Sequence, residues 1–446
     1  MKIPKKPPNQ KEVFDGILED IDKVKVFFKT SQKIETHGDY LHWDKLRFKI
    51  PLTDLSKEEY WSAVKHKRNA TSKAVPFSPI QPSEEKFHFT RPDCMYSKLR
   101  KLDIQTGGSV DSKDLTVSQS DATKYLRRSL LEEPFSSSVL EGAITTRVRA
   151  RELIETGKPP QTKDDLMVVN NYLAMAFIKQ HIHDDLTPDL ILECQRIITH
   201  GTLDRPDMAG KIRDNNEIVV GDDYGQVFHI PPDFNELENR LEVICKFANA
   251  TDDEDSPFIH PIVRASILHF MLSYDHPFVD GNGRTARALF YWSVLKAGYW
   301  MMEYVSISSA INKAPTQYGL AFLHTETDDN DLTYFILYQL KVVEKAIQEL
   351  QGYMERQRSK YKRLETFLKN ENFNHRQTTL LNDMFRNRVA STTIVKYRDQ
   401  YEISFQTARK DLEYLTSEDW LKKKKSGKEN LYTSGSKTRL LDSIST

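Results

Sequence analysis

The sequence has only three cysteines, at positions 94, 194 and 245, in a chain of 446 residues. Disulfide frameworks and clustered zinc sites need cysteines in closely spaced pairs, so neither kind of site is expected. Cys194 and Cys245 fall on the apolar stripes of two expected helices. We therefore expect both of them to be buried free thiols rather than metal or redox groups.

Long apolar runs and an excess of charge of either sign are absent as well. No segment approaches the about 18 apolar residues that span a membrane. The basic start MKIPKKPPNQKEVF is not followed by the apolar region of a secretory signal. Lysine plus arginine and aspartate plus glutamate number 64 each, so a nucleic-acid surface would have to be a local patch. These absences predict a cytoplasmic protein that makes no contact with a membrane.

What the chain does have is length and helical periodicity. Its 446 residues exceed one typical core, and 39% are hydrophobic, so two or three globular domains are expected. Residues 1–115 carry no motif that indicates a role. Helical patterns dominate residues 116–350, after a polar, turn-rich crossing at 105–121. Residues 351–375 are expected to form a charged helical linker, and 376–446 a separate unit.

The C-terminal unit has three short helical stretches followed by a basic hairpin. Ser404 is the expected N-cap of the third stretch, and Ser426-Gly427 is the expected turn of the hairpin. This order predicts a winged helix-turn-helix. Lysines 422–425 and Lys428 suit a phosphate backbone, which makes DNA a candidate partner. A lysine run is more often a solvated surface, and such units also contact proteins.

One segment interrupts the helical pattern of the central region. It is KIRDNNEIVVGDDYGQVFHIPP, residues 211–232. Two short β-like runs, EIVV and QVFHI, flank the turn-forming sequence GDDYG, which predicts a β-hairpin.

The stretch HPFVDGNGRTAR, residues 276–287, lies between an apolar helix and the next helix. Gly281 and Gly283 let the backbone approach a ligand closely. The first N–H groups of the second helix lack intrahelical acceptors and form a natural anion site. Arg284 and Arg287, three residues apart, add two guanidinium groups suited to phosphate oxygens. The stretch therefore predicts a phosphate site.

Three further side chains of the stretch bear on chemistry. Asp280 offers an oxygen ligand for a divalent ion beside the phosphates, and Asn282 can donate its amide to a phosphoryl oxygen. His276 titrates near neutrality and can take a proton from an attacking hydroxyl. Together they predict nucleophilic attack on a nucleotide phosphate. A rival interpretation makes His260, His269 and His276 metal ligands, but their spacing does not place all three on one helix face.

HPFVDGNGR, with Arg287 three residues further on, closely resembles the signature of Fic-domain proteins. That signature is His-Pro-Phe, any residue, Asp or Glu, Gly-Asn-Gly-Arg, then an arginine, and every fixed position is present. The segments AGKIRDNNEIVV and HPIVRASILHF resemble the family's context, and the resemblance covers about residues 120–350. It implies a mainly α fold, a Fic-type helical bundle with a small β-hairpin flap. It also implies transfer of AMP from ATP to a hydroxyl of a target protein.

The resemblance also assigns roles to residues of the motif. His276 would be the general base, and Asp280 would hold Mg²⁺. Asn282, with the loop amides around Gly281 and Gly283, would hold the α-phosphate. Arg284 would hold the β- and γ-phosphates. The flap would pair with the target's backbone by strand addition, through Val219, Val220, Phe228 and His229.

Upstream, EEPFSSSVLEG places Ser137 and Glu141 four residues apart on an expected helix, followed by Gly142. This resembles the inhibitory motif of Fic proteins: Ser or Thr, three residues, Glu, then Gly or Asn. The resemblance implies an inhibitory helix, about residues 124–155, in which Glu141 pairs with Arg287 and denies that arginine to the γ-phosphate. The plainer interpretation is a solvated helix glutamate.

Three functions remain open from the sequence. The first is an autoinhibited protein adenylyltransferase that also modifies itself. The second is a DNA-binding regulator whose Fic core senses a nucleotide. The third is removal of AMP from a modified protein, with Glu141 orienting water. A homodimer is compatible with each of them.

Overall fold

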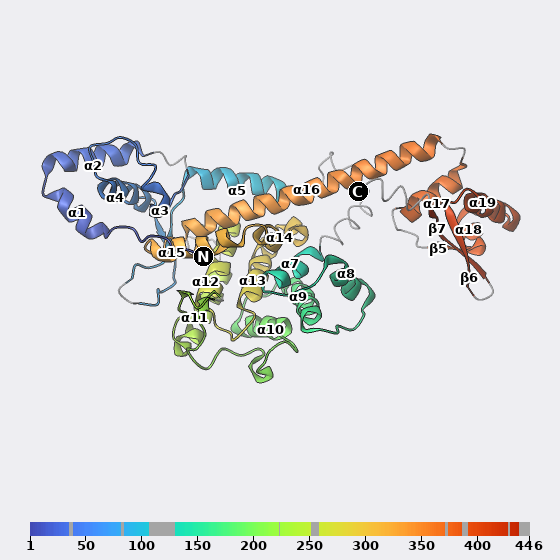
Figure 1. The fold of residues 1–446 in the computed structure, drawn as a ribbon, viewed down its shortest axis with the longest axis horizontal. Helices are drawn as coiled ribbons and strands as arrows, with labels where there is room; N and C mark the ends of the chain where they lie inside the picture. Colours follow the sequence, from blue (N-terminus) through green and yellow to red (C-terminus); the bar gives the residue numbers. More distant parts are fainter. Residues whose placement is uncertain are drawn as a thin grey trace. The chain divides into compact units, whose positions relative to one another are not determined.

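The computed structural model describes most of the chain, with short gaps. The described residues are 1–34, 39–81, 84–106, 130–222, 224–250, 258–370, 373–385, 391–426 and 429–436. They form mainly helices with a few short strands (Figure 1), so the predicted fold class is confirmed. The chain divides into two compact units, residues 1–115 with 126–350, and residues 116–125 with 351–446. Residues 107–121 of the expected polar crossing and 124–129 of the expected inhibitory helix lie outside the described residues.

The first unit opens with helices that begin at polar capping residues. The side chains of Asn9 and Asp20 accept hydrogen bonds from the first turns of two helices, and Ser56 forms a capping box with Glu59. A buried cluster that includes Phe27 holds these helices together. The elements are α1 (Gln10–Leu18), α2 (Ile21–Lys33), α3 (Trp43–Leu46), α4 (Lys57–Asn69), β1 (Lys73–Ala74), β2 (His88–Phe89) and α5 (Asp93–Thr106).

The centre of this unit is the antiparallel pair α12 (Pro261–Asp275) and α13 (Asn282–Lys296) (Figure 1). Helix α12 is apolar on nearly every side, and α13 is buried along most of its length although it begins with polar and basic residues. They are surrounded by α7 (Glu132–Leu140), α8 (Arg147–Thr156), α9 (Lys163–Gln180), α10 (Pro188–Ile198), α11 (Leu237–Asn249), α14 (Ile307–Asn312), α15 (Pro315–Thr327) and the part of α16 (Thr333–Asn370) up to residue 350. Cys194 and Cys245 are buried free thiols in α10 and α11, as predicted.

The predicted hairpin between α10 and α11 is confirmed. Strand β3 (Val220–Gly221) pairs with β4 (Val227–His229) in antiparallel fashion, with a shift of register between its two residues. The side chain of Asp222 closes the turn by accepting hydrogen bonds from the N–H groups of Tyr224 and Gln226. Residues 217–219 of the expected first run lie outside β3, whereas Gly221 of the expected turn belongs to it, and both strands are short.

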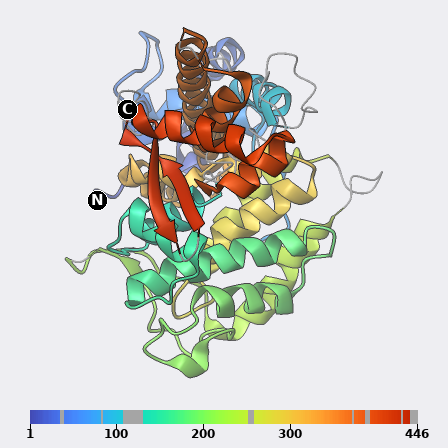
Figure 2. The same cartoon turned by 90° about the vertical axis from the view of Figure 1, so that its right-hand side faces the viewer.

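The second unit contains α17 (His375–Phe385), β5 (Ser391–Thr392), α18 (Ile394–Tyr401), α19 (Phe405–Ser417), β6 (Leu421–Ser426) and β7 (Glu429–Ser434). The strands form one sheet in the order β5-β7-β6, and Figure 2 shows β6 and β7 as a long hairpin. Ser404 caps α19 by accepting a hydrogen bond from the Thr407 N–H. This order of elements agrees with the expected one, and the winged-helix assignment stays a prediction. Gly427 and Lys428 of the expected turn lie outside the described residues.

Across the parts of the chain that the structure describes, none of the helices combines the length and the apolar character needed to cross a membrane.

Candidate active site

The stretch 276–287 forms the connection from α12 to α13, and two of its residues adopt left-handed backbone conformations. His276 has φ 45° and caps α12 by donating its N–H to the Leu272 carbonyl. Gly281 has φ 85°, and a Cβ there would lie 2.9 Å from Thr199 Cγ2. Both the dihedral angle and the close approach of α10 therefore require glycine at this position.

The side chain of Asn282 closes the loop. Its Oδ1 accepts a hydrogen bond from the Phe278 N–H at 2.9 Å, and its Nδ2 donates to the Phe278 carbonyl at 2.8 Å. Asn282 and Phe278 are both buried. Because Nδ2 carries a second hydrogen, donation of the Asn282 amide to a phosphoryl oxygen stays a prediction. Asn282 also offers an anion its backbone N–H, in the first turn of α13.

His276 is held as a neutral base. Its Nδ1 lies 3.2 Å from the Ser273 carbonyl, to which it can only donate, and this assigns the lone pair to Nε2. Burial lowers the pKa of His276 to about 4, and the nearby His229 adds to that effect. Arg213 fixes the backbone here, because its Nε donates to the His276 carbonyl at 3.1 Å. A neutral imidazole at pH 7 can accept a proton.

Arg284 is fully buried and is turned toward α10. Its Nη1 donates to the Ile198 carbonyl at 3.2 Å, and its Nη2 donates to Asp280 Oδ1 at 3.2 Å. The same carboxylate oxygen accepts the Gly281 N–H, and the Asp280 side chain is 44% exposed. For Arg284 to hold phosphates, its guanidinium would have to exchange these partners for phosphate oxygens.

Arg287 meets the predicted inhibitory motif. Its Nε donates to Ser137 Oγ at 3.0 Å, and its Nη2 donates to the Ser137 carbonyl at 3.2 Å and to Glu141 Oε1 at 2.8 Å. The arginine is buried, and 146 positions separate it from Glu141. The contact that the resemblance implies between Glu141 and Arg287 is therefore present.

The Glu141 carboxylate also lies directly over the start of α13. A Cβ at Gly283 would be 2.3 Å from Glu141 Oε1 and 3.0 Å from Arg287 Nη1. Glycine at this position gives the carboxylate access to the helix N-terminus, where negative charge is favoured. An anionic side chain of this chain thus occupies the place expected for phosphate.

Helix α7, which carries Ser137, is anchored by a buried glutamate that sequence reasoning missed. Glu133 accepts hydrogen bonds from Ser306 Oγ at 2.8 Å, from the Ser308 N–H at 3.0 Å and from Ser308 Oγ at 2.5 Å. Burial raises the pKa of Glu133. The sequence signal that could have identified Glu133 is an acidic residue in the first turn of a helix that otherwise has small and apolar side chains.

The four flap residues differ in their exposure. Val219 is exposed, and Val220 and Phe228 are partly buried. His229 is buried between two helices, with Nδ1 2.7 Å from Glu326 Oε2 and Nε2 2.7 Å from the Tyr274 carbonyl. Its side chain therefore belongs to the interior, and the expectation that it docks a target is wrong for the side chain. The backbone of the flap is the part that suits strand addition.

The rival metal interpretation finds no support in the geometry. His260 Nε2 contacts Asp103 at 3.1 Å, and His269 Nε2 contacts the Tyr318 hydroxyl at 2.8 Å, so the two histidines have partners of their own. Within the described ranges, the group of side chains placed to share a metal ion is His42, Asp44 and His324. That group shares no residue with the loop 276–287.

Comparison with known proteins agrees with this geometry. Residues 185–294 match the model of the Fic/DOC family. The chain contains a Fic domain. The protein adenylyltransferase Fic of Drosophila melanogaster is 32% identical over 213 residues, which are 45% of this chain and 40% of the relative. That of Nematostella vectensis is 28% identical over 216 residues, 45% of this chain and 47% of the relative. The chain spans less than half the length of these relatives.

Solved structures with Fic folds are also similar to this chain. Fic-1 (residues 134–508) from C. elegans is 24% identical, with a TM-score of 0.45 over 58% of this chain and 71% of that one. A Fic family protein from Desulfovibrio desulfuricans G20 is 16% identical, with a TM-score of 0.48 over 76% of this chain and 94% of that one.

Because Asn282 closes the loop, we expect its substitution to destabilise the protein even when no nucleotide is present. Asn282→Ala leaves the buried N–H and carbonyl of Phe278 without partners, so the free energy of unfolding should fall by about 1–3 kcal/mol. Urea unfolding measures this. The control is Asn235→Ala, which removes an exposed amide and should change the free energy by less than about 0.5 kcal/mol. Equal effects of the two substitutions would contradict the bracing role.

The burial of His276 predicts an acidic titration. The His276 signal in a histidine-labelled sample, assigned with His276→Ala, should titrate near pH 4 instead of near 6.5. The folded state disfavours the charged ring, so the contribution of His276 to stability is complete above about pH 6.5 and declines as the pH falls toward 4. A midpoint near 6.5 in the folded protein would show that Nε2 is open to water.

Proposed function

We propose that this chain is an autoinhibited protein adenylyltransferase, which transfers AMP from ATP to a hydroxyl group of a target protein. The observation that carries the proposal is the Glu141 carboxylate, which lies over Gly283 and is bonded to Arg287. An anion site is complete at the start of α13, and the chain fills it with its own acid. The relatives named protein adenylyltransferase Fic support the choice of reaction.

In this reaction the hydroxyl oxygen of the target attacks the α-phosphorus of ATP. His276 Nε2 takes the hydroxyl proton, a new P–O bond forms, and the bond between the α-phosphorus and the bridging oxygen breaks to release pyrophosphate. The N–H groups at the start of α13 face the α-phosphate, and the guanidinium groups of Arg284 and Arg287 receive the β- and γ-phosphates. The flap backbone around Val219 and Val220 aligns the target segment.

Asp280 fits a magnesium ion. Its Oδ1 is used by Gly281 and Arg284, and the remaining carboxylate oxygen belongs to a side chain that is 44% exposed. One carboxylate combined with substrate phosphates is a donor set that Mg²⁺ commonly takes. Asp280 would hold the ion, which would neutralise charge on the phosphates.

The proposed autoinhibition follows from competition between two anions. A buried arginine needs a negative partner, and Glu141 and a γ-phosphate compete for Arg287. While Glu141 keeps the arginine, ATP cannot place its phosphates productively. A role for Glu141 in orienting water for AMP removal would use the same residue. The exposed lysines 422–425 of β6 leave DNA as a second candidate partner, and the cytoplasm and a homodimer stay predictions.

Removal of the inhibitory carboxylate should activate transfer. A charge-assisted hydrogen bond contributes about 1.5–3 kcal/mol, so Glu141→Gly should raise labelled-AMP transfer to itself and to lysate proteins by about tenfold or more. The control is Glu141→Gly combined with His276→Ala, which should be inactive. Mass spectrometry of the lysate then identifies the modified target. Equal transfer by wild type and Glu141→Gly would remove the autoinhibition part of the proposal.

The proposed autoinhibition also predicts that substitutions of Glu141 and Arg287 have strongly coupled effects on transfer. Arg287→Ala should lower transfer, because the arginine also serves the nucleotide. In a double-mutant cycle, Glu141→Gly should give little activation once Arg287 is absent, since nothing is left to release. Additive effects of the two substitutions would show that Glu141 acts elsewhere.

The proposed metal role predicts that two treatments are equivalent. Asp280→Asn in the Glu141→Gly protein should stop transfer, and so should chelation of Mg²⁺, with no further loss when both are applied. Asp280→Glu should retain part of the activity at saturating Mg²⁺. Full transfer in the presence of chelator would make Asp280 a loop brace and nothing more.

A further inference from the structure

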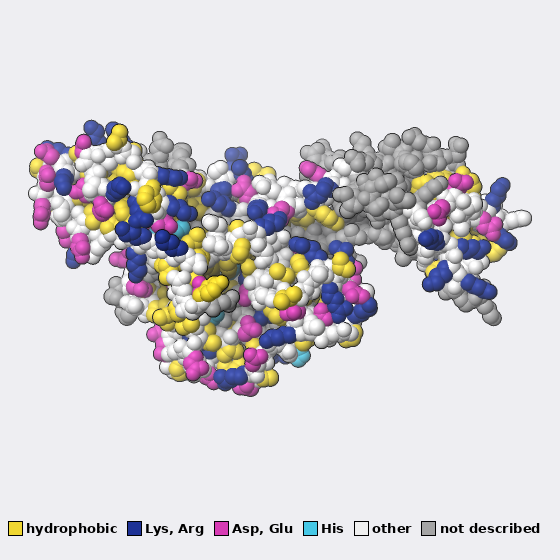
Figure 3. Space-filling model, in the orientation of Figure 1, with side chains coloured by type: hydrophobic (Ala, Val, Ile, Leu, Met, Phe, Trp, Pro, Cys, Tyr) yellow, Lys and Arg dark blue, Asp and Glu magenta, His cyan; other side chains and the backbone are white. Residues whose placement is uncertain are grey.

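A second cavity of about 540 Å³ lies in the first unit, away from the loop 276–287. One side is formed by α3 and the residues before it, and the others by α14, α15 and α16, with Cys94 and Lys98 of α5 at its edge. Figure 3 shows Lys and Arg side chains gathered over the region where Figure 1 places α3, α15 and the beginning of α16. The cavity and this basic surface belong to the same part of the molecule.

Three lysines that line the cavity lack an acidic partner. They are Lys45 on α3 and Lys341 and Lys345 on α16, and none of them forms an ion pair with any described residue. Lys341 and Lys345 are four residues apart on one helix face, where two like charges destabilise a helix. The lining contains one acid, Asp39. All three lysines are exposed, so solvent screens their charges, and an anion that enters the cavity meets them at its rim.

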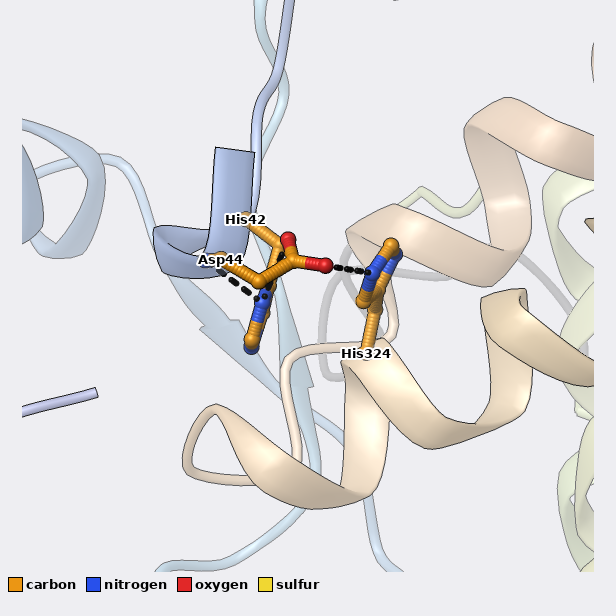
Figure 4. Close-up of side chains that lie close together, drawn as sticks. All are labelled: His42, Asp44 and His324. Atoms are coloured by element: carbon orange, nitrogen blue, oxygen red, sulfur yellow. Dashed lines mark hydrogen bonds and ion pairs between the residues drawn. The ribbon is translucent and has the colours of Figure 1, made fainter. Parts of the chain in front are cut away.

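His42 and His324 line the cavity at α3 and α15, and Figure 4 shows that both rings face the Asp44 carboxylate. Asp44 Oδ1 lies 3.1 Å from His42 Nδ1, and Asp44 Oδ2 lies 3.5 Å from His324 Nε2. The rings are stacked, with centroids 4.5 Å apart and planes 15° from parallel. A ring nitrogen of each histidine thus lies near the Asp44 carboxylate, and the two rings form a polar part of the cavity lining.

The interior of the cavity is apolar. Leu41, Leu320 and Leu337 line it, and Tyr334 adds an aromatic ring that contacts both histidine rings. A purely inorganic anion would leave this surface unused. A basic rim over an apolar and aromatic interior fits a ligand with a phosphate group at one end and a flat organic body at the other.

We infer that this cavity binds a phosphorylated small molecule with an aromatic body, the chemistry of a nucleoside monophosphate. This inference goes beyond the proposed AMP transfer, because the cavity shares no residue with the loop that contains His276. The phosphate contacts Lys341 and Lys345, with Lys45 on the opposite side, and the base lies against the apolar wall. Ala310 and Ala314, at α14 and just after it, also line the cavity. The same helix carries Ser308, which binds Glu133 of α7.

The test is isothermal titration calorimetry with guanosine 5′-monophosphate in the absence of Mg²⁺. The full-length Arg287→Ala protein is used throughout, so that the anion loop of the Fic domain lacks one of its arginines. Lys341→Gln with Lys345→Gln should weaken binding at least about tenfold, because two charge-assisted contacts are removed. The matched control is Lys25→Gln with Lys29→Gln, which removes two exposed lysines at the same spacing on α2 and should leave the affinity unchanged.

Inorganic pyrophosphate, titrated in parallel, tests whether the organic part of the nucleotide contributes to binding. It should bind more weakly than the nucleotide and should be equally sensitive to loss of Lys341 and Lys345. Binding of the nucleotide that is insensitive to these two lysines, or no binding at millimolar concentration, overturns the inference. Melting curves of both double variants verify that they are folded. Because the readout is binding and not AMP transfer, failure here is distinct from failure of the proposed function.

Discussion

A buried arginine beside a helix N-terminus must have an anion, and the Fic domain of this chain depends on that constraint. Arg287 is buried, and the start of α13 adds partial positive charge next to it. Leaving such a charge unpaired would be strongly destabilising. The chain meets the requirement with Ser137 and Glu141, so the state without nucleotide is stabilised by the contact that occupies the phosphate site. One interaction therefore stabilises this part of the fold and, under the proposed function, also keeps the γ-phosphate away from Arg287.

The same constraint explains why the loop is so rigid. An anion can be held at the start of α13 only if the preceding residues leave the first N–H groups uncovered. The left-handed conformations of His276 and Gly281 turn the chain sharply, and Asn282 closes the turn on Phe278. The turn that frees the helix N-terminus also fixes the imidazole beside it. Base and anion site are therefore positioned by one short piece of backbone.

The sequence predicted those features that are local and missed those that depend on packing. The loop and its glycines were predicted from the spacing within one motif, whereas the contact of Glu141 with Arg287 was implied by the resemblance to Fic proteins. The direction of a side chain such as Asn282, which points back into its own loop, follows from a turn that composition does not reveal. His229 appeared as a strand residue of a hairpin, and only the packing of Glu326 and Tyr274 against it makes the side chain interior.

The N-terminal region shows a similar limit. Its helices begin at Asn9, Asp20 and Ser56, which are ordinary capping residues, but short helices with mixed faces give little periodic signal. The contacts that join this region to the Fic domain are long-range, such as the Tyr40 hydroxyl on the Asp331 carboxylate at 2.5 Å. No pattern within residues 1–106 indicates that pairing, because its partner lies 291 positions away.

The position of Glu141 directly after α7 decides how its contact with Arg287 can open. Three residues of α7 anchor the helix. Glu133 bonds to the start of α14, the Ser136 carbonyl accepts a hydrogen bond from Asn312, and Ser138 bonds to α9. None of these contacts involves Arg287. Glu141 follows the last helical residue, and Gly142, with φ 91°, comes directly after it. The carboxylate can thus leave Arg287 by rotation of one side chain at the end of an anchored helix, so a competing anion can shift this contact without unfolding α7.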